Sequence, residues 1–199
     1  MNYPLTVKDR FRQIAIETAR MSYPGSMSRG RKPVVRAGTK KRIEEFFSSD
    51  QFALSDLTLP RWSPAAYGDW HGITTGALAD RLATASYVAG PDNNPSAVAA
   101  KFLDTFMHQL MKYSEFRPVL PHLHLALDRR VLGRLKALRY SPPAREISGR
   151  VGGQSPYSIS YDDYRFVQGR LWELVAELNE RRGMEFQISS RIELNLLWL

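Results

Sequence analysis

The sequence predicts an all-α protein: a single compact multi-helix domain with a basic loop or arm near the N-terminus. Apolar residues recur at helical spacing in several segments. Capping residues precede most of these segments, and no alternating strand pattern extends beyond a few residues. With 199 residues, of which 43% are hydrophobic, the chain can build a substantial core. We therefore expect residues 1–199 to form one domain of roughly seven helices.

The first predicted helix covers residues 6–21. Thr6 is followed three residues later by Asp9, which is the spacing of a capping box. Residues 23–38 then combine Gly, Pro and Ser with basic side chains. This composition is typical of a flexible loop, so we expect a basic arm there.

A short second helix is predicted over residues 40–47, with Thr39 as its cap. Residues 50–72 are rich in aromatic side chains but contain Pro60 and Pro64, which disfavour regular structure. We expect this segment to be an irregular connection whose aromatic residues pack into the core.

The middle of the chain predicts two further helices. One begins at Thr74 or Thr75 and continues to about residue 88, where the Gly- and Pro-rich run 90–95 predicts a turn. The longest helix is expected over residues 96–116, because its apolar residues repeat every three and four positions.

Three more helices are expected towards the C-terminus. The first covers residues 128–138 and begins at Asp128. Residues 141–157 contain three prolines and three glycines, which favours a loop or lid. A long helix follows from Ser160 to Gly183, and the last helix is expected to start at Ser190.

The composition excludes several classes of chemistry. There is no cysteine, so disulfides, thiolate nucleophiles and zinc–thiolate sites are ruled out. No apolar run reaches the length that a membrane span requires, and the N-terminus is polar, so we expect a cytoplasmic protein without a membrane partner. No phosphate-binding or dinucleotide-binding loop is present, so we expect no cofactor.

The distribution of charge favours a nucleic-acid partner, with DNA the first candidate. The net charge is +8, and the basic residues gather in two acid-free stretches, one between residues 18 and 43 and the other after Asp128. The alternative is a generally basic protein with two solvated faces. The predicted nucleic-acid-binding residues are Arg29, Arg31, Lys32, Arg36, Lys40, Lys41, Arg129, Arg130 and Arg134.

Asp128 is the residue to which the sequence assigns the most specific role. An Asp at a helix start is most often a cap. Here it follows an apolar approach and precedes a basic helix, in the run Leu127-Asp128-Arg129-Arg130-Val131-Leu132-Gly133-Arg134-Leu135. Over about residues 75–139 this arrangement resembles the helix-hairpin-helix DNA glycosylases. The resemblance implies that Asp128 is the catalytic carboxylate, which stabilises positive charge on the sugar as the base departs.

The chain also departs from that family. The family's hairpin binds phosphate through a Gly-x-Gly turn, whereas this chain has Asp92 in the run 90–95. Members with lyase activity carry a lysine nucleophile near the hairpin exit. Lys101 lies near that place, but on a helix and at a long spacing from Asp128. Asp128 is therefore the one residue to which this resemblance assigns a role.

The four histidines complete the candidate residues. A metal site could be drawn from His122 and His124 together with His108 or His71. This spacing matches no established metal signature, so we expect no metal.

Three functions remain open from the sequence. The leading hypothesis is a DNA-binding protein that recognises or excises a modified base. The second is a non-enzymatic nucleic-acid-binding or nucleoprotein scaffold protein, and the third is an interaction module for an acidic protein partner. The sequence decides neither between DNA and RNA nor whether the chain is an enzyme, and it does not predict an oligomeric state.

Overall fold

The computed structural model describes residues 6–24, 27, 33–84, 87–138, 140–182, 188–191, 193 and 194. These residues confirm the all-α prediction, since the one strand-like pairing among them is an isolated bridge between Val35 and Val88. The helices, of which η2 and η3 are of the 3-10 type, are α1 (Val7–Ser22), α2 (Thr39–Phe47), η2 (Leu54–Thr58), α3 (Pro64–Thr84), α4 (Pro95–Leu110), η3 (Ser114–His122), α5 (Arg129–Ala137), α6 (Pro142–Val151) and α7 (Tyr161–Arg182).

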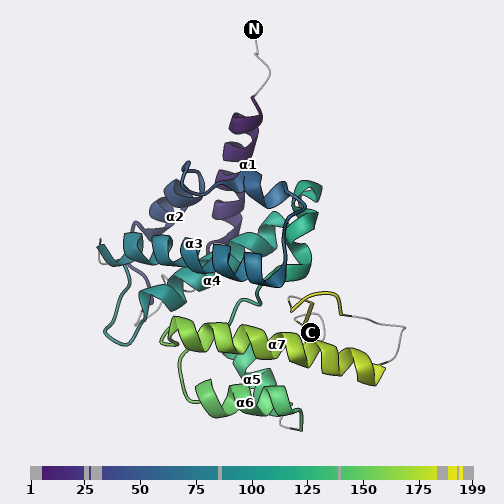
Figure 1. Ribbon diagram of the computed structural model, residues 1–199. Helices are drawn as coiled ribbons and strands as arrows, with labels where there is room; N and C mark the ends of the chain where they lie inside the picture. The colour runs from purple at the N-terminus through teal and green to yellow at the C-terminus, as the bar shows by residue number, and fades with distance from the viewer. Residues whose placement is uncertain are drawn as a thin grey trace.

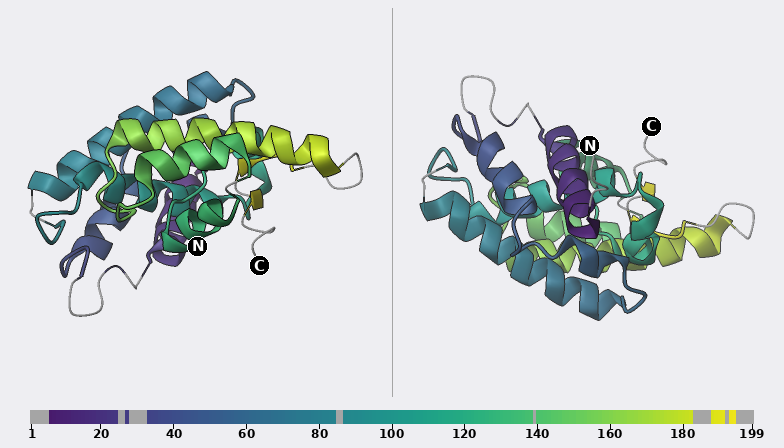
Figure 2. Two further views of the ribbon diagram at one scale, coloured as in Figure 1. Left: turned by 90° about the horizontal axis from the view of Figure 1, so that it is seen from below. Right: turned by 90° about the horizontal axis from the view of Figure 1, so that it is seen from above.

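The helices are stacked in layers. In Figure 1, α1 and α2 lie above α3 and α4, and α7 crosses below them with α5 and α6 on its far side. Viewed from below, α6 lies alongside α7, and viewed from above, α1 lies in front of the other helices (Figure 2). The helices α3 and α4 therefore form the layer between the N-terminal and C-terminal parts of the molecule.

The buried apolar residues form two clusters. The N-terminal cluster gathers side chains from α1 to η3, and in it the rings of Phe47 and Phe106 stack with their centroids 3.9 Å apart. The C-terminal cluster gathers side chains from α5, α6 and α7, with Leu171 at full burial. Helix α4 contributes to both, through Phe102 to the first and Ala100 to the second. The boundary between the clusters thus runs along α4.

Several predicted helix starts are confirmed. The side chain of Thr6 accepts a hydrogen bond from the backbone N–H of Asp9, and the Asp9 side chain completes the capping box. Asp128 caps α5. Ser160 accepts a hydrogen bond from the N–H of Asp163 at 3.0 Å and precedes α7.

Two segments predicted to be irregular are helical, so these predictions are wrong. Helix α3 begins at Pro64, within the expected connection 50–72, and α6 occupies most of the expected loop 141–157. In both cases proline stands in the first turn of the helix, where its missing N–H has no helical partner to lose. The buried side chains of Ala144, Ile147 and Val151 then give α6 its apolar face.

Two helix boundaries also differ from the prediction. Helix α4 ends at Leu110 rather than near residue 116, and η3 follows it. The cap of α2 is Gly38 with φ of 90°, not Thr39, whose hydroxyl donates to the carbonyl of Arg36 at 2.7 Å. A glycine suits this position because the left-handed conformation carries little strain without a Cβ.

Two expectations fall partly outside the described residues. The structure does not describe residues 25, 26 and 28–32 of the expected arm, nor most of the helix expected from Ser190. In the described part of that helix, Glu193 accepts a hydrogen bond from the N–H of Ser189, at 2.8 Å, rather than from Ser190.

Candidate functional site

The two carboxylate oxygens of Asp128 have different partners. Oδ1 accepts hydrogen bonds from the N–H groups of Arg130 and Val131, each at 2.8 Å, and so caps α5. Oδ2 lies 3.9 Å from the Nζ atom of Lys101. The side chain remains 42% exposed, so the carboxylate is a cap that still faces solvent.

Lys101 lies closer to Asp128 than the sequence predicted. It lies on α4, far along the chain from Asp128, yet the fold brings the two together. Its side chain is only 11% exposed, and burial lowers the pKa of the amine, an effect that the charges of Asp128 and Asp104 oppose. A partly desolvated amine beside a carboxylate is the main feature of this site.

A hollow of about 310 Å³ opens next to the Lys101–Asp128 pair. It is lined by Val34, Asp128, Arg129, Arg130, Pro156 and Tyr157. Burial raises the pKa of the Tyr157 hydroxyl, and the Asp128 charge adds to this shift. Val34 belongs to the first basic stretch, so one residue of that stretch lies beside the start of α5.

Helix α5 presents a cationic face. Arg129, Arg130, Arg134 and Lys136 are exposed, while Val131, Leu132 and Leu135 are buried on the opposite side. Among the described residues, none of these four cations has a carboxylate within 4.0 Å, in contrast to Arg150, Arg170 and Arg181 on α6 and α7. Arg129, Arg130 and Arg134 are among the binding residues predicted from the sequence, whereas Lys136 is not.

The remaining predicted binding residues are less concentrated. Arg36, Lys40 and Lys41 are exposed at the start of α2 and just before it. Arg36 lines a separate hollow with Pro91 and Asn93. Arg29, Arg31 and Lys32 lie outside the described residues.

A buried polar network, which sequence analysis did not predict, lies between the two apolar clusters. It joins His71 of α3, Asp104 of α4, His124 of the segment before α5, and Tyr164 of α7, all at most 7% exposed. The Tyr164 hydroxyl lies 2.8 Å from Asp104 Oδ2 and 3.0 Å from His124 Nδ1. His71 Nε2 lies 3.1 Å from Asp104 Oδ1. The signal in the sequence was Asp104 itself, a lone acid inside the apolar pattern of α4.

Counting donors and acceptors assigns the protons of this network. Asp104 accepts from the Tyr164 hydroxyl and from His71 Nε2–H. The hydroxyl of Tyr164 has then donated its proton, so it accepts from His124 Nδ1–H. His71 Nδ1 in turn accepts from the Tyr161 hydroxyl at 3.0 Å. In this assignment both ring nitrogens of His71 have a partner, as does Nδ1 of His124.

The same network offers a donor set for a metal ion. One ligand atom each from His71, Asp104 and His124 lies within 4.8 Å of the others, a combination suited to a transition metal. The Tyr164 hydroxyl, however, lies within 3.4 Å of all three residues and occupies the space between them. Hydrogen bonds account for these contacts. Of the metal set drawn from the sequence, His71 and His124 lie together, whereas His122 and His108 do not join them, and the expectation of no metal stays a prediction.

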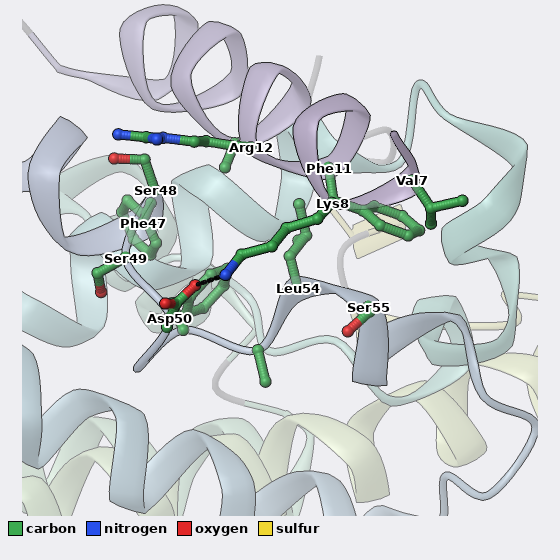
Figure 3. A pocket seen from close by; sticks show the side chains of 13 residues that line it. Val7, Lys8, Phe11, Arg12, Phe47, Ser48, Ser49, Asp50, Leu54 and Ser55 are labelled. Carbon is green, nitrogen blue, oxygen red and sulfur yellow. Dashed lines mark ion pairs between the residues drawn. The ribbon is translucent and has the colours of Figure 1, made fainter. Parts of the chain in front are cut away.

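A wide hollow of about 690 Å³ lies between α1 and the segment 48–55 (Figure 3). Its apolar lining includes Phe11, Phe47 and Leu54. At its mouth Lys8 and Asp50 form an ion pair at 3.0 Å. None of its lining residues belongs to the predicted sites.

Comparison of the chain with protein-family models, with curated proteins and with solved structures finds no match. Among the described residues no helix is long and apolar enough to cross a membrane. The resemblance to the helix-hairpin-helix glycosylases therefore still depends on the residues around Asp128.

The buried network predicts that stability depends on pH. Burial, with contributions from His71, Arg191 and Arg165, holds the pKa of His124 well below its ordinary value. A histidine in the unfolded chain takes up a proton below about pH 6.5, whereas folded His124 remains neutral. The unfolded state then binds more protons, so the free energy of unfolding falls by up to about 1.4 kcal/mol for each pH unit below that point.

Urea unfolding at pH 7.5, 6.0 and 5.0 measures this effect. His124→Gln should lower stability at pH 7.5 and should make the decrease between pH 7.5 and 5.0 smaller than in the wild type. An equal decrease in both proteins would show that His124 does not contribute to the pH dependence.

Proposed function

We propose that this protein binds nucleic acid, DNA in the first instance, through the exposed face of α5 and the adjoining hollow. The observation that carries the proposal is the set of four exposed cations, Arg129, Arg130, Arg134 and Lys136, which have no carboxylate partner among the described residues. On α6 and α7, by contrast, Arg150, Arg170 and Arg181 are paired with acids. An unpaired cationic helix is what a polyphosphate backbone requires.

The geometry around the hollow also supports this function. Tyr157 offers an aromatic wall beside Arg129 and Arg130, which is suited to an unstacked base next to phosphates. Arg129 also lines a neighbouring hollow of about 340 Å³ together with Lys136 and Gly153. A nucleic-acid strand lying along α5 would thus meet the cations that line both hollows.

The proposal predicts a specific salt dependence. Neutralising Arg129, Arg130 and Arg134 to Gln should weaken binding to a duplex oligonucleotide. It should also lower the slope of log K against log salt by about 0.9 for each phosphate that the variant no longer neutralises. Fluorescence anisotropy at a series of salt concentrations around the physiological value measures both quantities.

The matched control neutralises three arginines that are held in ion pairs, Arg61, Arg170 and Arg181. This triple variant carries the same net charge and should keep most of the slope. If the slope falls equally in both triple variants, only the total charge matters and α5 is not the interface.

A second candidate function is excision of a damaged base with cleavage at the resulting sugar. The proximity of Lys101 to Asp128 favours it, because a desolvated amine is a competent nucleophile toward an aldehyde. On this account the Lys101 amine condenses with the aldehyde of an abasic sugar. Water leaves, and an imine forms. Asp128 stabilises the positive charge that develops on the sugar.

Borohydride trapping tests this function directly. Hydride reduces the imine to a stable amine, so wild-type protein should become covalently linked to DNA that contains an abasic site. Lys101→Gln should abolish the linked product, whereas Lys112→Gln, at an exposed lysine near the end of α4, should not. Asp128→Asn keeps the helix cap and removes a charge that raises the pKa of Lys101, so it should not lower the yield on this substrate, from which the base is already absent. Undiminished trapping by Lys101→Gln would exclude the lysine mechanism while leaving the binding proposal intact.

A further inference from the structure

A further pocket, of about 280 Å³, is lined by His124 of the buried network. The start of α3, the segment containing His122 and His124, the middle of α7 and Arg191 surround it. None of its residues lines the hollow at Asp128. The pocket is therefore a separate site with its own chemistry.

Arg191 is a buried cation in this pocket. It is 7% exposed, and its guanidinium donates to three backbone carbonyls, those of His122, Leu123 and Gln168. It also lies 5.5 Å from the ring centroid of Trp172. Carbonyl groups orient a guanidinium but do not neutralise it, and no carboxylate of the described residues lies within 4.0 Å. Two of its five N–H donors have no acceptor among those residues.

The other charges of the pocket do not compensate Arg191. Arg165 is exposed at the pocket wall, without a carboxylate partner among the described side chains. Glu173 also lines the pocket, but it is held by Arg170 at 2.5 Å. Two guanidinium groups thus line a pocket whose one acid is already paired, which favours an anionic ligand.

His124 gives the pocket a hydrogen-bond acceptor. Its Nδ1–H donates to Tyr164, and the neutral ring therefore carries a lone pair on Nε2. His124 lines the pocket, and Nε2 is the ring nitrogen that the network leaves for a ligand. A fully ionised anion has no proton to offer this atom, whereas hydrogen phosphate does.

We propose that this pocket binds hydrogen phosphate, either free or as the monoanion of a phosphate monoester. Arg165 and Arg191 contact the anionic oxygens, and His124 Nε2 accepts a hydrogen bond from the protonated oxygen. The arrangement selects phosphate over sulfate, because sulfate leaves Nε2 facing an oxygen lone pair. The site is independent of the nucleic-acid interface on α5.

Isothermal titration with inorganic phosphate, sulfate and adenosine monophosphate at pH 6.0 and constant ionic strength tests the proposal. Phosphate should bind at least about tenfold more tightly than sulfate, a difference of about 1.4 kcal/mol. Tighter binding of the monophosphate than of inorganic phosphate assigns the site to an ester, and the reverse assigns it to the free ion.

Two variants of α7 distinguish phosphate binding in this pocket from a general effect of net charge on binding. Arg165→Gln should weaken phosphate binding at least about tenfold, whereas Arg181→Gln, which removes the same charge from an arginine paired with Glu177 outside the pocket, should change it less than twofold. Equal affinity for phosphate and sulfate, equal effects of the two variants, or no binding heat at millimolar phosphate would each overturn the proposal.

Discussion

The buried carboxylate of Asp104 is the group on which the relation between the two halves of the molecule depends. An ionised carboxylate out of water costs several kcal/mol unless hydrogen bonds compensate it. Here the compensating donors come from different elements, His71 from α3 and Tyr164 from α7. Because Asp104 lies on α4, between the two apolar clusters, α7 must pack against α3 and α4 in one register to satisfy it. Apolar contacts alone would tolerate several registers.

The same network sets the geometry at the candidate interface. Lys101 and Asp104 are one turn apart on α4, and His124 and Asp128 are four residues apart on the segment that enters α5. Gln168 of α7 fixes this segment by accepting from the N–H of Leu125 at 3.0 Å and donating to its carbonyl at 2.7 Å. Aligning His124 with Tyr164 therefore places Asp128 beside Lys101. The cationic surface of α5 and the pocket at Arg191 therefore both depend on the buried network for their geometry.

The sequence predicted those parts of the fold that local chemistry determines. The capping box at Thr6 and the caps at Ser160 and Asp128 were predicted correctly, because a cap depends only on residues a few positions away. Helix α6 was missed because its prolines and glycines are typical of a loop. The structure places Pro142 in the first turn and Gly149 where a Cβ would meet nothing within 4 Å.

The functional sites also divide into features that nearby residues determine and features that depend on long-range packing. Exposed arginines on α5 could be predicted from helical periodicity, since the buried positions define the opposite face. The proximity of Lys101 to Asp128 could not be predicted in this way, because the two residues lie on different elements. The packing of these elements depends on Tyr164, which is distant in the sequence. Spacing along the chain suggested metal sets around His122 and His124, whereas the fold places the His124 ring beside His71 and bonds its Nδ1 to the Tyr164 hydroxyl.

A double-mutant cycle between Asp104 and Tyr164 tests the central claim most directly. The free energy of unfolding would be measured in urea for the wild type, Asp104→Asn, Tyr164→Phe and the double variant. If the hydroxyl and the carboxylate form the bond that joins the two halves, the coupling energy should be about 1–3 kcal/mol. Single-variant effects that add to within about 0.5 kcal/mol would contradict the account, since independent sites show such additivity.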